Sequence, residues 1–330
     1  MKLVHHCKRL LTAFIVTTLT VSMLACSDKH DTTHYDTSAD GKPSVETAMV
    51  LVPAGKFIRG SNKVDNAGLQ QQYGFPTPLY LDEQPMQEIA LDAFYIDTYE
   101  VTFKQYKDFI EKTKRMMPFT WVNSGYALTE SGINSMDLKT LRKVALDYFK
   151  LDMDTRVMDK PALVKAMLES QKKRDRLPVG GINWFNAVAY CKWRSARLPT
   201  EAEWEKAARG SDGREFPWGN KWDEKITNTG DDAQWEDGIA PVGSYPNNKS
   251  PYGAYDMAGN VWEWVADWYD AYPGSKYHAP AFGKTNRVIR GGGGGIGHYA
   301  ISYFFRAASR QFSEPEMESD DVGFRCAKDA

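Results

Sequence analysis

The stretch from Gly210 onward constrains this chain most, because it has few long runs of regularly spaced apolar residues. It is rich instead in Trp, Gly, Asn and Pro, a texture that favours irregular loops and short strands. The chain holds 10 Trp, 17 Tyr and 15 Phe residues, enough for a large aromatic core. Together these features predict a mixed α+β domain held together by buried aromatic side chains.

Before Gly210 the sequence predicts several regular elements. Residues 49–57 are typical of a strand, a turn and a strand, and residues 91–97 of a second strand. Thr102 and Asn183 are expected to cap helices, and residues 200–203 (TEAE) form a capping box. The residues expected on the buried helix faces are Tyr106, Phe109 and Ile110, then Trp184, Ala187, Val188 and Cys191, then Trp204, Ala207 and Ala208.

Length and charge exclude some classes of partner. A chain of 330 residues can hold one domain of more than 250 residues. The net charge is -2, with neither a basic block nor an acidic tail. We therefore expect no nucleic-acid partner.

The N-terminus is typical of an export signal. Lys2, Lys8 and Arg9 precede an uncharged, mostly apolar run, residues 10–25, that is shorter than the ~20 residues of a bilayer span. The run ends at Cys26, which resembles the lipidated first residue of a bacterial lipoprotein; plain cleavage near Ala25 or a short membrane anchor are the alternatives. Residues 1–25 would be the signal peptide. We then expect a lipoprotein of the cell envelope, in the outer membrane and facing the periplasm or the surface.

The next segment, residues 26–46, is predicted to be a flexible tether. It is rich in Asp, Ser, Thr, His and Lys and has almost no large apolar residue. Such a segment cannot bury enough apolar surface to become ordered. The folded domain is expected to span residues 47–330. Loss of residues 1–25 removes three positive charges from a net charge of -2, which leaves -5.

A series of motifs then follows along residues 49–328. They are residues 178–184 (PVGGINW), 189–193 (AYCKW), 197–205 (RLPTEAEWE), 216–220 (FPWGN), 253–264 (GAYDMAGNVWEW), 290–292 (RGG) and 323–326 (GFRC). In this order they resemble the formylglycine-generating enzymes, the sulfatase-modifying factor family. The resemblance covers about 280 residues. It implies a C-type-lectin-like fold of the formylglycine-generating type, with little regular secondary structure.

The resemblance also implies bound calcium. In the family, the loop that matches residues 256–263 binds calcium; by position its ligands here would be the Asp256 and Glu263 side chains and the Gly259 and Val261 carbonyls. Alternatively, the two carboxylates only cap backbone amides. A second calcium site of the family starts at an asparagine like Asn228, but the interval before residues 240–242 is shorter here. Its acidic candidates are Asp232, Glu236 and Asp237.

Two cysteines remain after the signal and the lipidation site, Cys191 and Cys326. In an exported protein two remaining cysteines most simply form a disulfide, although a redox pair is the alternative. Their positions match one of the structural disulfides of the family.

The chain departs from the family where the oxidase chemistry is carried out. The family holds copper with two cysteines in the segment after Gly-Gly, and residues 290–310 contain no cysteine. Copper(I) selects thiolate ligands, so copper and formylglycine-generating activity are not expected, and no catalytic residue is assigned. A serine that the family places after Gly-Gly is Gly293 here. Only His278 and His298 lie in this domain, which does not support three-histidine iron chemistry.

The same segment is rich in side chains that are typical of binding surfaces. Aromatic residues and arginines supply most interface hot spots, and the family holds its substrate on this face. The predicted binding surface consists of Trp262, His298, Tyr299, Tyr303, Phe305, Arg306, Arg310 and Phe312. The alternative is that about half of the aromatic residues fill the core.

Residues 115–175 depart from the usual spacing of the family. Leu138, Leu141 and Ala145 sit at helical spacing, as do Leu163 and Met167 after Pro161. We expect an inserted pair of helices with an apolar face, which packs on the domain or docks a partner.

Two functions remain open. The chain is a non-catalytic binding or scaffolding lipoprotein of the envelope, with a protein or small-molecule ligand. Alternatively it is a metal-dependent oxidoreductase or maturation factor of changed chemistry. A catalytic form should retain a transition metal, whereas a binding module should carry calcium at most.

Overall fold

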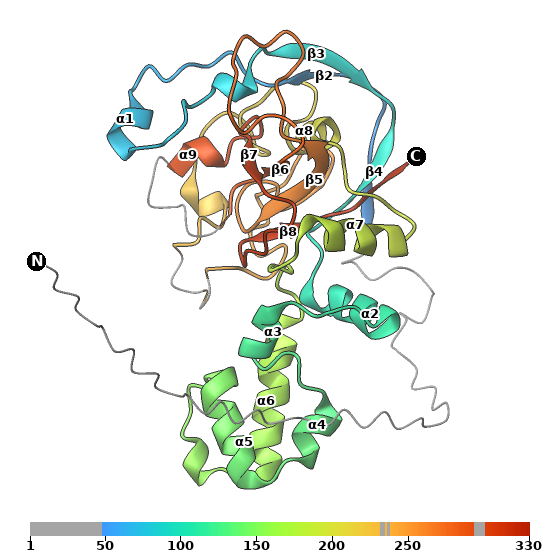
Figure 1. Ribbon diagram of the computed structural model, residues 1–330, viewed down its shortest axis with the longest axis vertical. Coiled ribbons are helices and arrows are strands. Elements are labelled where there is room, and N and C mark those ends of the chain that lie inside the picture. Colours follow the sequence, from blue (N-terminus) through green and yellow to red (C-terminus); the bar gives the residue numbers. More distant parts are fainter. Residues whose placement is uncertain (1–47, 232–234, 236–237, 294–300) are drawn as a thin grey trace, which may run out of the picture. The chain divides into compact units, whose positions relative to one another are not determined.

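The computed structural model describes residues 48–231, 235, 238–293 and 301–330. The chain divides into two compact units, Met1–Lys42 and Pro43–Ala330. All of the described residues belong to the second unit. It is a mixed α+β structure in which short strands and helices are joined by long irregular segments (Figure 1).

Three small sheets carry the strands. The first has the order β1-β4-β9, the second pairs β2 with β3, and the third has the order β7-β6-β5-β8. All strand pairs are antiparallel except β5 with β8. The strands are β1 (Met49–Val52), β2 (Gly55–Arg59), β3 (Gln87–Leu91), β4 (Phe94–Asp97), β5 (Trp262–Trp268), β6 (Arg287–Arg290), β7 (Gln311–Ser313), β8 (Val322–Phe324) and β9 (Ala327–Asp329).

The strand predictions are largely confirmed. The strand, turn and strand expected at residues 49–57 are β1 and β2. The strand expected at residues 91–97 begins later, at Phe94, because Leu91 ends β3 and pairs with Gly55 of β2. Between Gly210 and Val261 the described residues form turns, isolated bridges and the 3-10 turn η5 (Glu224–Ile226), as the sequence texture predicts.

The capped helices also follow the sequence. Thr102 and Gln105 form a capping box at α2, Asn183 accepts a hydrogen bond from the Asn186 amide at α7, and Thr200 caps α8 with Glu203. These side chains satisfy amides that have no partner inside the first helical turn. The helices are α1 (Leu69–Tyr73), α2 (Phe103–Thr113), α3 (Phe119–Asn123), α4 (Glu130–Ser135), α5 (Leu138–Val144), α6 (Lys160–Arg174), α7 (Trp184–Trp193), α8 (Glu201–Arg209) and α9 (Ile301–Phe304).

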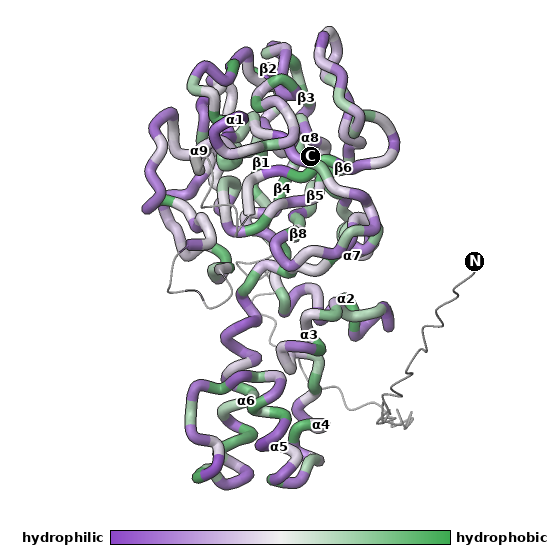
Figure 2. The backbone as a smooth tube through the Cα atoms, turned by 60° about the vertical axis from the view of Figure 1, so that its left-hand side comes forward, coloured by the Kyte–Doolittle hydropathy of each residue, from purple (hydrophilic) through white to green (hydrophobic). Residues whose placement is uncertain are grey.

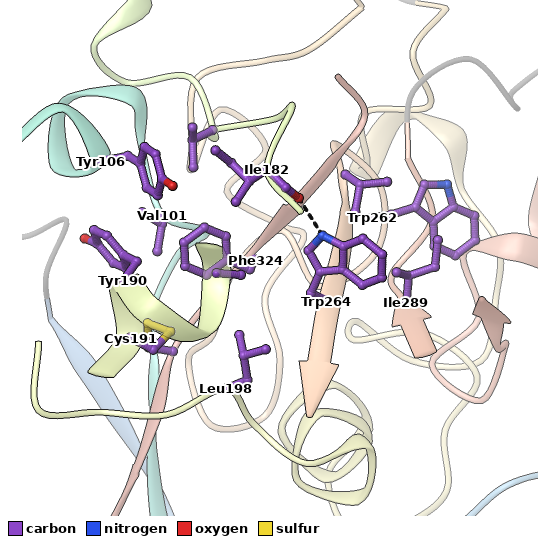
Figure 3. Close-up of a cluster of buried hydrophobic side chains, with 14 of the residues drawn as sticks. Val101, Tyr106, Ile182, Tyr190, Cys191, Leu198, Trp262, Trp264, Ile289 and Phe324 are labelled. Carbon is purple, nitrogen blue, oxygen red and sulfur yellow. Dashed lines mark hydrogen bonds between the residues drawn. A yellow bond between two sulfur atoms is a disulfide. The ribbon is translucent and has the colours of Figure 1, made fainter. Parts of the chain in front are cut away.

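The main core lies where α2 and α7 meet β5 and β8. Trp264 of β5 is fully buried, and its indole Nε1 donates a hydrogen bond to the Ile182 carbonyl at 2.7 Å (Figure 3). Phe324 of β8 contacts the ring of Tyr190, with ring centroids 5.3 Å apart. Because the indole N–H of Trp264 keeps a hydrogen-bond partner, the large ring can be buried without loss of hydrogen bonding. Buried aromatic side chains therefore do form the core, as predicted.

A disulfide joins α7 to the C-terminal segment. Cys191 and Cys326 are both fully buried, and their sulfur atoms are 1.99 Å apart. The bond closes a loop with a sequence separation of 135 residues. It fastens the central helix to the short link between β8 and β9, and this is the cysteine pairing that the family resemblance implies.

The inserted segment is more elaborate than a helix pair. Between α2 and α7 the chain forms α3, α4, α5, a π-helical turn (Ala145–Phe149), a 3-10 turn (Thr155–Val157) and α6. The apolar side chains predicted to pack on the domain or on a partner form a separate small core. That core holds Ile133, Leu141, Ala145, Phe149, Leu163, Val164 and Met167.

Candidate functional site

Gly291, Gly292 and Gly293 directly follow strand β6 and lead into the segment in which the family holds its cysteines. Gly291 and Gly292 have φ values of 100° and 81°, which glycine adopts easily and L-residues do not. A Cβ atom on Gly292 would lie 2.8 Å from the Phe305 ring, and one on Gly293 would lie 2.5 Å from Cδ1 of Trp262. A serine at residue 293, as in the family, would therefore collide with Trp262.

The predicted binding surface is wrong for most of its residues. Trp262, Tyr303, Phe305, Arg306 and Arg310 are all buried, with at most 5% of each residue exposed. Their rings and guanidinium groups face the interior, so the alternative that these side chains fill the core is the correct one. The sequence does not reveal this because aromatic residues and arginines are typical of both locations.

The remaining residues of that prediction have mixed outcomes. Phe312 is half-buried, and its ring stacks on Tyr269 with centroids 4.5 Å apart. Its ring is thus largely part of the second aromatic cluster. His298 and Tyr299 lie outside the described residues.

Ion pairs explain why two arginines of this segment can be buried. Arg306 donates to both carboxylate oxygens of Glu83, at 2.9 Å for Nη1 to Oε2. Arg310 binds Glu201 in the same two-pronged way, with Nε to Oε1 at 2.7 Å and Nη2 to Oε2 at 3.0 Å. A charge that is paired with an opposite charge can be buried at a far lower cost than an unpaired one.

Further buried charges anchor helix α8 to strand β6. Arg290 at the end of β6 donates to Glu201 and to Glu205, both at 2.9 Å. Glu205 also accepts from Arg209 at 2.8 Å. This network fixes the start of the glycine segment.

The predicted calcium loop is buried and tightly turned. Asp256 and Asn260 have φ values of 57° and 70°, and Gly259 has 91°. Glu263 is fully buried, and its carboxylate accepts two hydrogen bonds from Arg325, both at 2.7 Å. Most of the acceptor capacity of Glu263 is therefore used by the protein itself.

A third carboxylate, Glu100, joins this loop and was missed by sequence reasoning. Its Oε1 accepts from Nδ2 of Asn260 at 3.1 Å, whereas its Oε2 is buried and finds no hydrogen-bond partner among the described residues. Burial raises the pKa of Asp256 to about 6, and burial and the Asp256 charge raise the pKa of Glu100 well above its usual value. No sequence signal separates Glu100 from an ordinary residue before a helix cap.

These residues fit a divalent cation by charge. Glu100, Asp256 and Glu263 are buried around one guanidinium, that of Arg325, and excess buried charge is relieved either by a counter-charge or by protonation. Within residues 48–231, 235, 238–293 and 301–330, no three His, Cys, Asp or Glu side chains are placed to hold one metal ion. Calcium would therefore need the backbone carbonyls of the loop beside its carboxylates.

Asn228, the start of the second predicted calcium site, contacts the same loop. Its Nδ2 donates to Oδ1 of Asn260 at 3.0 Å, and its Oδ1 accepts from the Gly230 amide at 3.1 Å. The side chain thus braces the first loop. Asp232, Glu236 and Asp237 lie outside the described residues, so a second site stays a prediction.

An open cleft of about 370 Å³ lies where the inserted segment meets the rest of the domain. Phe119 of α3 and Tyr148 of the π-helical turn contribute rings that are 52% and 40% exposed. A cleft of this volume is within the range of small-ligand sites. The other lining residues are Phe103, Thr120, Asn123, Ser124, Lys150, Arg174, Leu177, Pro178, Gly180, Ile239 and Asp320.

One wall of the cleft depends on a glycine. A Cβ atom on Gly180 would lie 1.9 Å from the Asp320 carbonyl oxygen, so only glycine allows the chain to pass there. The Gly181 amide donates to the Ser319 carbonyl at 2.8 Å and fixes this wall. With Lys150, Arg174 and Asp320 beside exposed rings, the cleft can hold a ligand that combines flat apolar and charged groups.

The described part of the chain contains no helix that is long and apolar enough to cross a membrane. The sulfatase-modifying factor enzyme 1-like domain matches residues 36–330. The chain belongs to this family. Its formylglycine-generating-type fold is therefore as the sequence motifs predict.

Related proteins include both active and inactive members. Bovine (Bos taurus) formylglycine-generating enzyme is 32% identical over 317 residues, which cover 88% of this chain and 76% of the bovine enzyme. Bovine inactive C-alpha-formylglycine-generating enzyme 2 is 30% identical over 299 residues, 86% of this chain and 88% of that protein. Membership of the sulfatase-modifying factor family therefore leaves activity open.

The fold also matches a solved structure. PvdO from Pseudomonas aeruginosa superposes with a TM-score of 0.53 at 23% identity, over 86% of this chain and 94% of PvdO. At that identity the likeness concerns the fold alone.

Proposed function

We propose that this member of the sulfatase-modifying factor family is a non-catalytic binding protein of the cell envelope. Both cysteines of its domain are buried in one disulfide, which is the observation that carries this proposal. A copper oxidase of the family type needs free thiolates. Residues 290–310 supply none.

The segment after β6 supports the same conclusion from packing. Gly293 leaves no space for a larger residue against Trp262, and Tyr303 and Phe305 are buried. These aromatic side chains are used to stabilise the domain. A relative named as inactive, 30% identical to this chain, indicates that the family keeps such members.

The open cleft beside α3 is where we place the ligand. Phe119 and Tyr148 expose about half of their surfaces there, and exposed aromatic side chains are common anchors of bound ligands. Lipidation of Cys26 would hold the domain at a membrane by acyl chains, with residues 26–46 as the tether. Calcium at the 256–263 loop would brace the domain by balancing its buried carboxylates.

Oxidase activity gives the first test. The purified protein is incubated with copper and a peptide that contains the sequence Cys-X-Pro-X-Arg, and the product is analysed by mass spectrometry. We expect the cysteine to remain unchanged. Detection of formylglycine would overturn the proposal. A stoichiometric redox-active metal in the purified protein would favour the alternative of a changed oxidoreductase.

Ligand capture gives the second test. Solubilised envelope material is passed over immobilised Pro43–Ala330, which forms one compact unit, and over its F119A/Y148A variant. We expect bound material that the variant no longer retains. Phe185→Ala removes an equally exposed ring outside the cleft lining (49% against 52% for Phe119) and serves as the matched control. Equal capture by the wild type and both variants would contradict the cleft as the binding site.

A further inference from the structure

Helix α6 of the inserted segment borders both the small core of the insertion and an open groove. Leu163 and Met167 are fully buried in the small core of the insertion. Pro161, Val164 and Leu168 line a groove on the helix, and their spacing of three and four residues places them on one side of it. Val164 also belongs to the small core, and Leu168 packs against it. Figure 2 shows hydrophobic and hydrophilic stretches alternating along α6. The groove therefore lies at the edge of this small core, where apolar side chains of α6 can still be reached from outside.

The outer groove has a volume of about 520 Å³. Asn134 of α4 forms its opposite side, and α4 and α6 lie side by side (Figure 1). Val164 is only 8% exposed and Leu168 is half-buried, so the floor lies below the surrounding side chains. Such a floor can accept apolar side chains from a partner.

Lysines surround this apolar floor. Lys160, Lys165 and Lys172 line the groove against one acidic residue, Glu169, which leaves a net charge of 3 - 1 = +2. The contact of Lys165 with Glu169 is 3.9 Å long, and the two side chains are 76% and 61% exposed. Such an exposed pair is weak and readily exchanged. The groove is thus positive on a chain whose net charge is -2.

We propose that this groove docks an acidic amphipathic helix of a partner protein. Apolar residues of that helix at i, i+3 and i+7 would meet Pro161, Val164 and Leu168, and its carboxylates would meet the lysines. This is the helix-in-groove mode of recognition, in which apolar anchors give affinity and charges give orientation and rate. The groove shares no lining residue with the cleft beside α3, so it is a second and independent site.

The N-terminal segment of the chain fits the groove less well. Residues 26–46 include Asp28, Asp31, Asp36, Asp40 and Glu46, which suit the lysines by charge. Their large apolar residues are only Tyr35 and Val45. That spacing offers no apolar stripe for the floor, so a partner helix is the occupant that matches both features.

The test uses Pro43–Ala330 and a fluorescent synthetic peptide about five turns long, with leucines at i, i+3 and i+7 and glutamates between them. We expect binding by fluorescence anisotropy that weakens as salt is raised. A second peptide, in which lysines replace the glutamates, should bind at least about tenfold more weakly.

Charge reversal locates the binding site. The K165E/K172E variant should lose at least about tenfold in affinity for the acidic peptide. The K139E/K143E variant reverses two exposed lysines of α5 that do not line the groove, and so changes the net charge by the same amount. It should bind the acidic peptide as the wild type does. All four lysines are exposed, so circular dichroism and the melting temperature are expected to stay unchanged.

Three results would overturn the inference. They are failure of the acidic peptide to bind, equal losses in the two variants, and concentration-dependent dimerisation that only K165E/K172E abolishes, which would make a second copy the occupant. Equal affinities of the full chain and of Pro43–Ala330 for the peptide would support it. Tenfold weaker binding by the full chain would instead identify the N-terminal segment as the competitor.

Discussion

Arg306 and Glu83 form a buried ion pair across 223 positions of the sequence, with Nη1 and Oε2 2.9 Å apart. Arg306 is 4% exposed and Glu83 is fully buried. The Arg306 guanidinium also lies 4.5 Å from the centre of the Tyr80 ring. This pair joins the segment after the glycines to the η2 turn (Leu81–Glu83) near the start of the domain.

Replacement of Arg306 by alanine should destabilise the domain strongly. Glu83 would be left as a buried charge without its partner, which costs about 3–5 kcal/mol of unfolding free energy. Urea unfolding followed by tryptophan fluorescence measures this loss. Arg156→Ala serves as the control because its pair with Asp154 is exposed, and we expect no measurable change there. A similar small effect for both variants would mean that the buried pair does not hold the segment.

Loss of the disulfide should also lower the unfolding free energy of the domain, because the unfolded chain gains entropy. Reduction, or the C191S/C326S variant, frees a loop with a sequence separation of 135 residues. The chain-entropy model gives a destabilisation of about 5 kcal/mol for a loop of that size. Thermal unfolding with and without a reducing agent measures the effect. If the reductant lowers the melting temperature of the double variant as well, the change does not come from this bond.

The stability of the folded domain should fall as the pH rises through the range of Asp82. Burial raises the pKa of Asp82 to about 6, while the Arg310 charge and the hydrogen bond from the Tyr269 hydroxyl oppose the shift. The folded state therefore holds a proton that the unfolded chain has already released above about pH 4. Between about pH 4 and 6 this group alone removes on the order of 3 kcal/mol of stability.

Asp82→Asn tests that dependence because asparagine does not titrate. Urea unfolding of the wild type and the variant at several pH values should show the wild type losing stability relative to the variant as the pH rises to about 6. Parallel curves across this range would show that the Asp82 carboxyl titrates normally.

Calcium should stabilise the domain if the 256–263 loop binds it. Calcium at one hundred times its dissociation constant would add about 2.7 kcal/mol of stability. We expect the melting temperature to rise with calcium and to fall with a chelator. Asp256→Asn and Glu100→Gln should each remove most of this response, since both carboxylates are buried at the loop. Asp147→Asn, at an exposed position of the insertion, should keep it, and an unchanged response in all three variants would place calcium elsewhere.

Some of the candidate site follows from the sequence and some does not. The motif at residues 253–264 locates Asp256 and Glu263, because the loop is contiguous in the chain. Glu100 reaches the same loop through Asn260, 160 positions away, and nothing near Glu100 in the sequence indicates this contact. The cleft likewise combines α3, the π-helical turn and Asp320. Segments so far apart meet only through tertiary packing.

The predicted binding surface also shows that the sequence does not reveal which side chains are buried. A sequence gives the identity of Arg310 and Tyr303 but not their partners, and both residue types are common inside and outside. Tertiary packing places Glu201 next to Arg310 and Glu83 next to Arg306. Burial of the two arginines then becomes possible because each charge has a counter-charge.

The sequence by itself determined the helix starts at Thr102, Asn183 and Thr200, the capping box at Thr200 and the absence of cysteine from residues 290–310. The helix starts and the capping box depend on residues within three or four positions of one another, where the backbone fixes the distances. The absence of cysteine follows from composition alone. The tertiary structure alone decided which aromatic residues and arginines are buried, that Glu100 completes the acidic loop and that a cleft and a lysine-rimmed groove stay open. Burial depends on contacts between residues that are far apart in the sequence, such as Arg306 and Glu83 at 223 positions, and those contacts arise only when the domain packs.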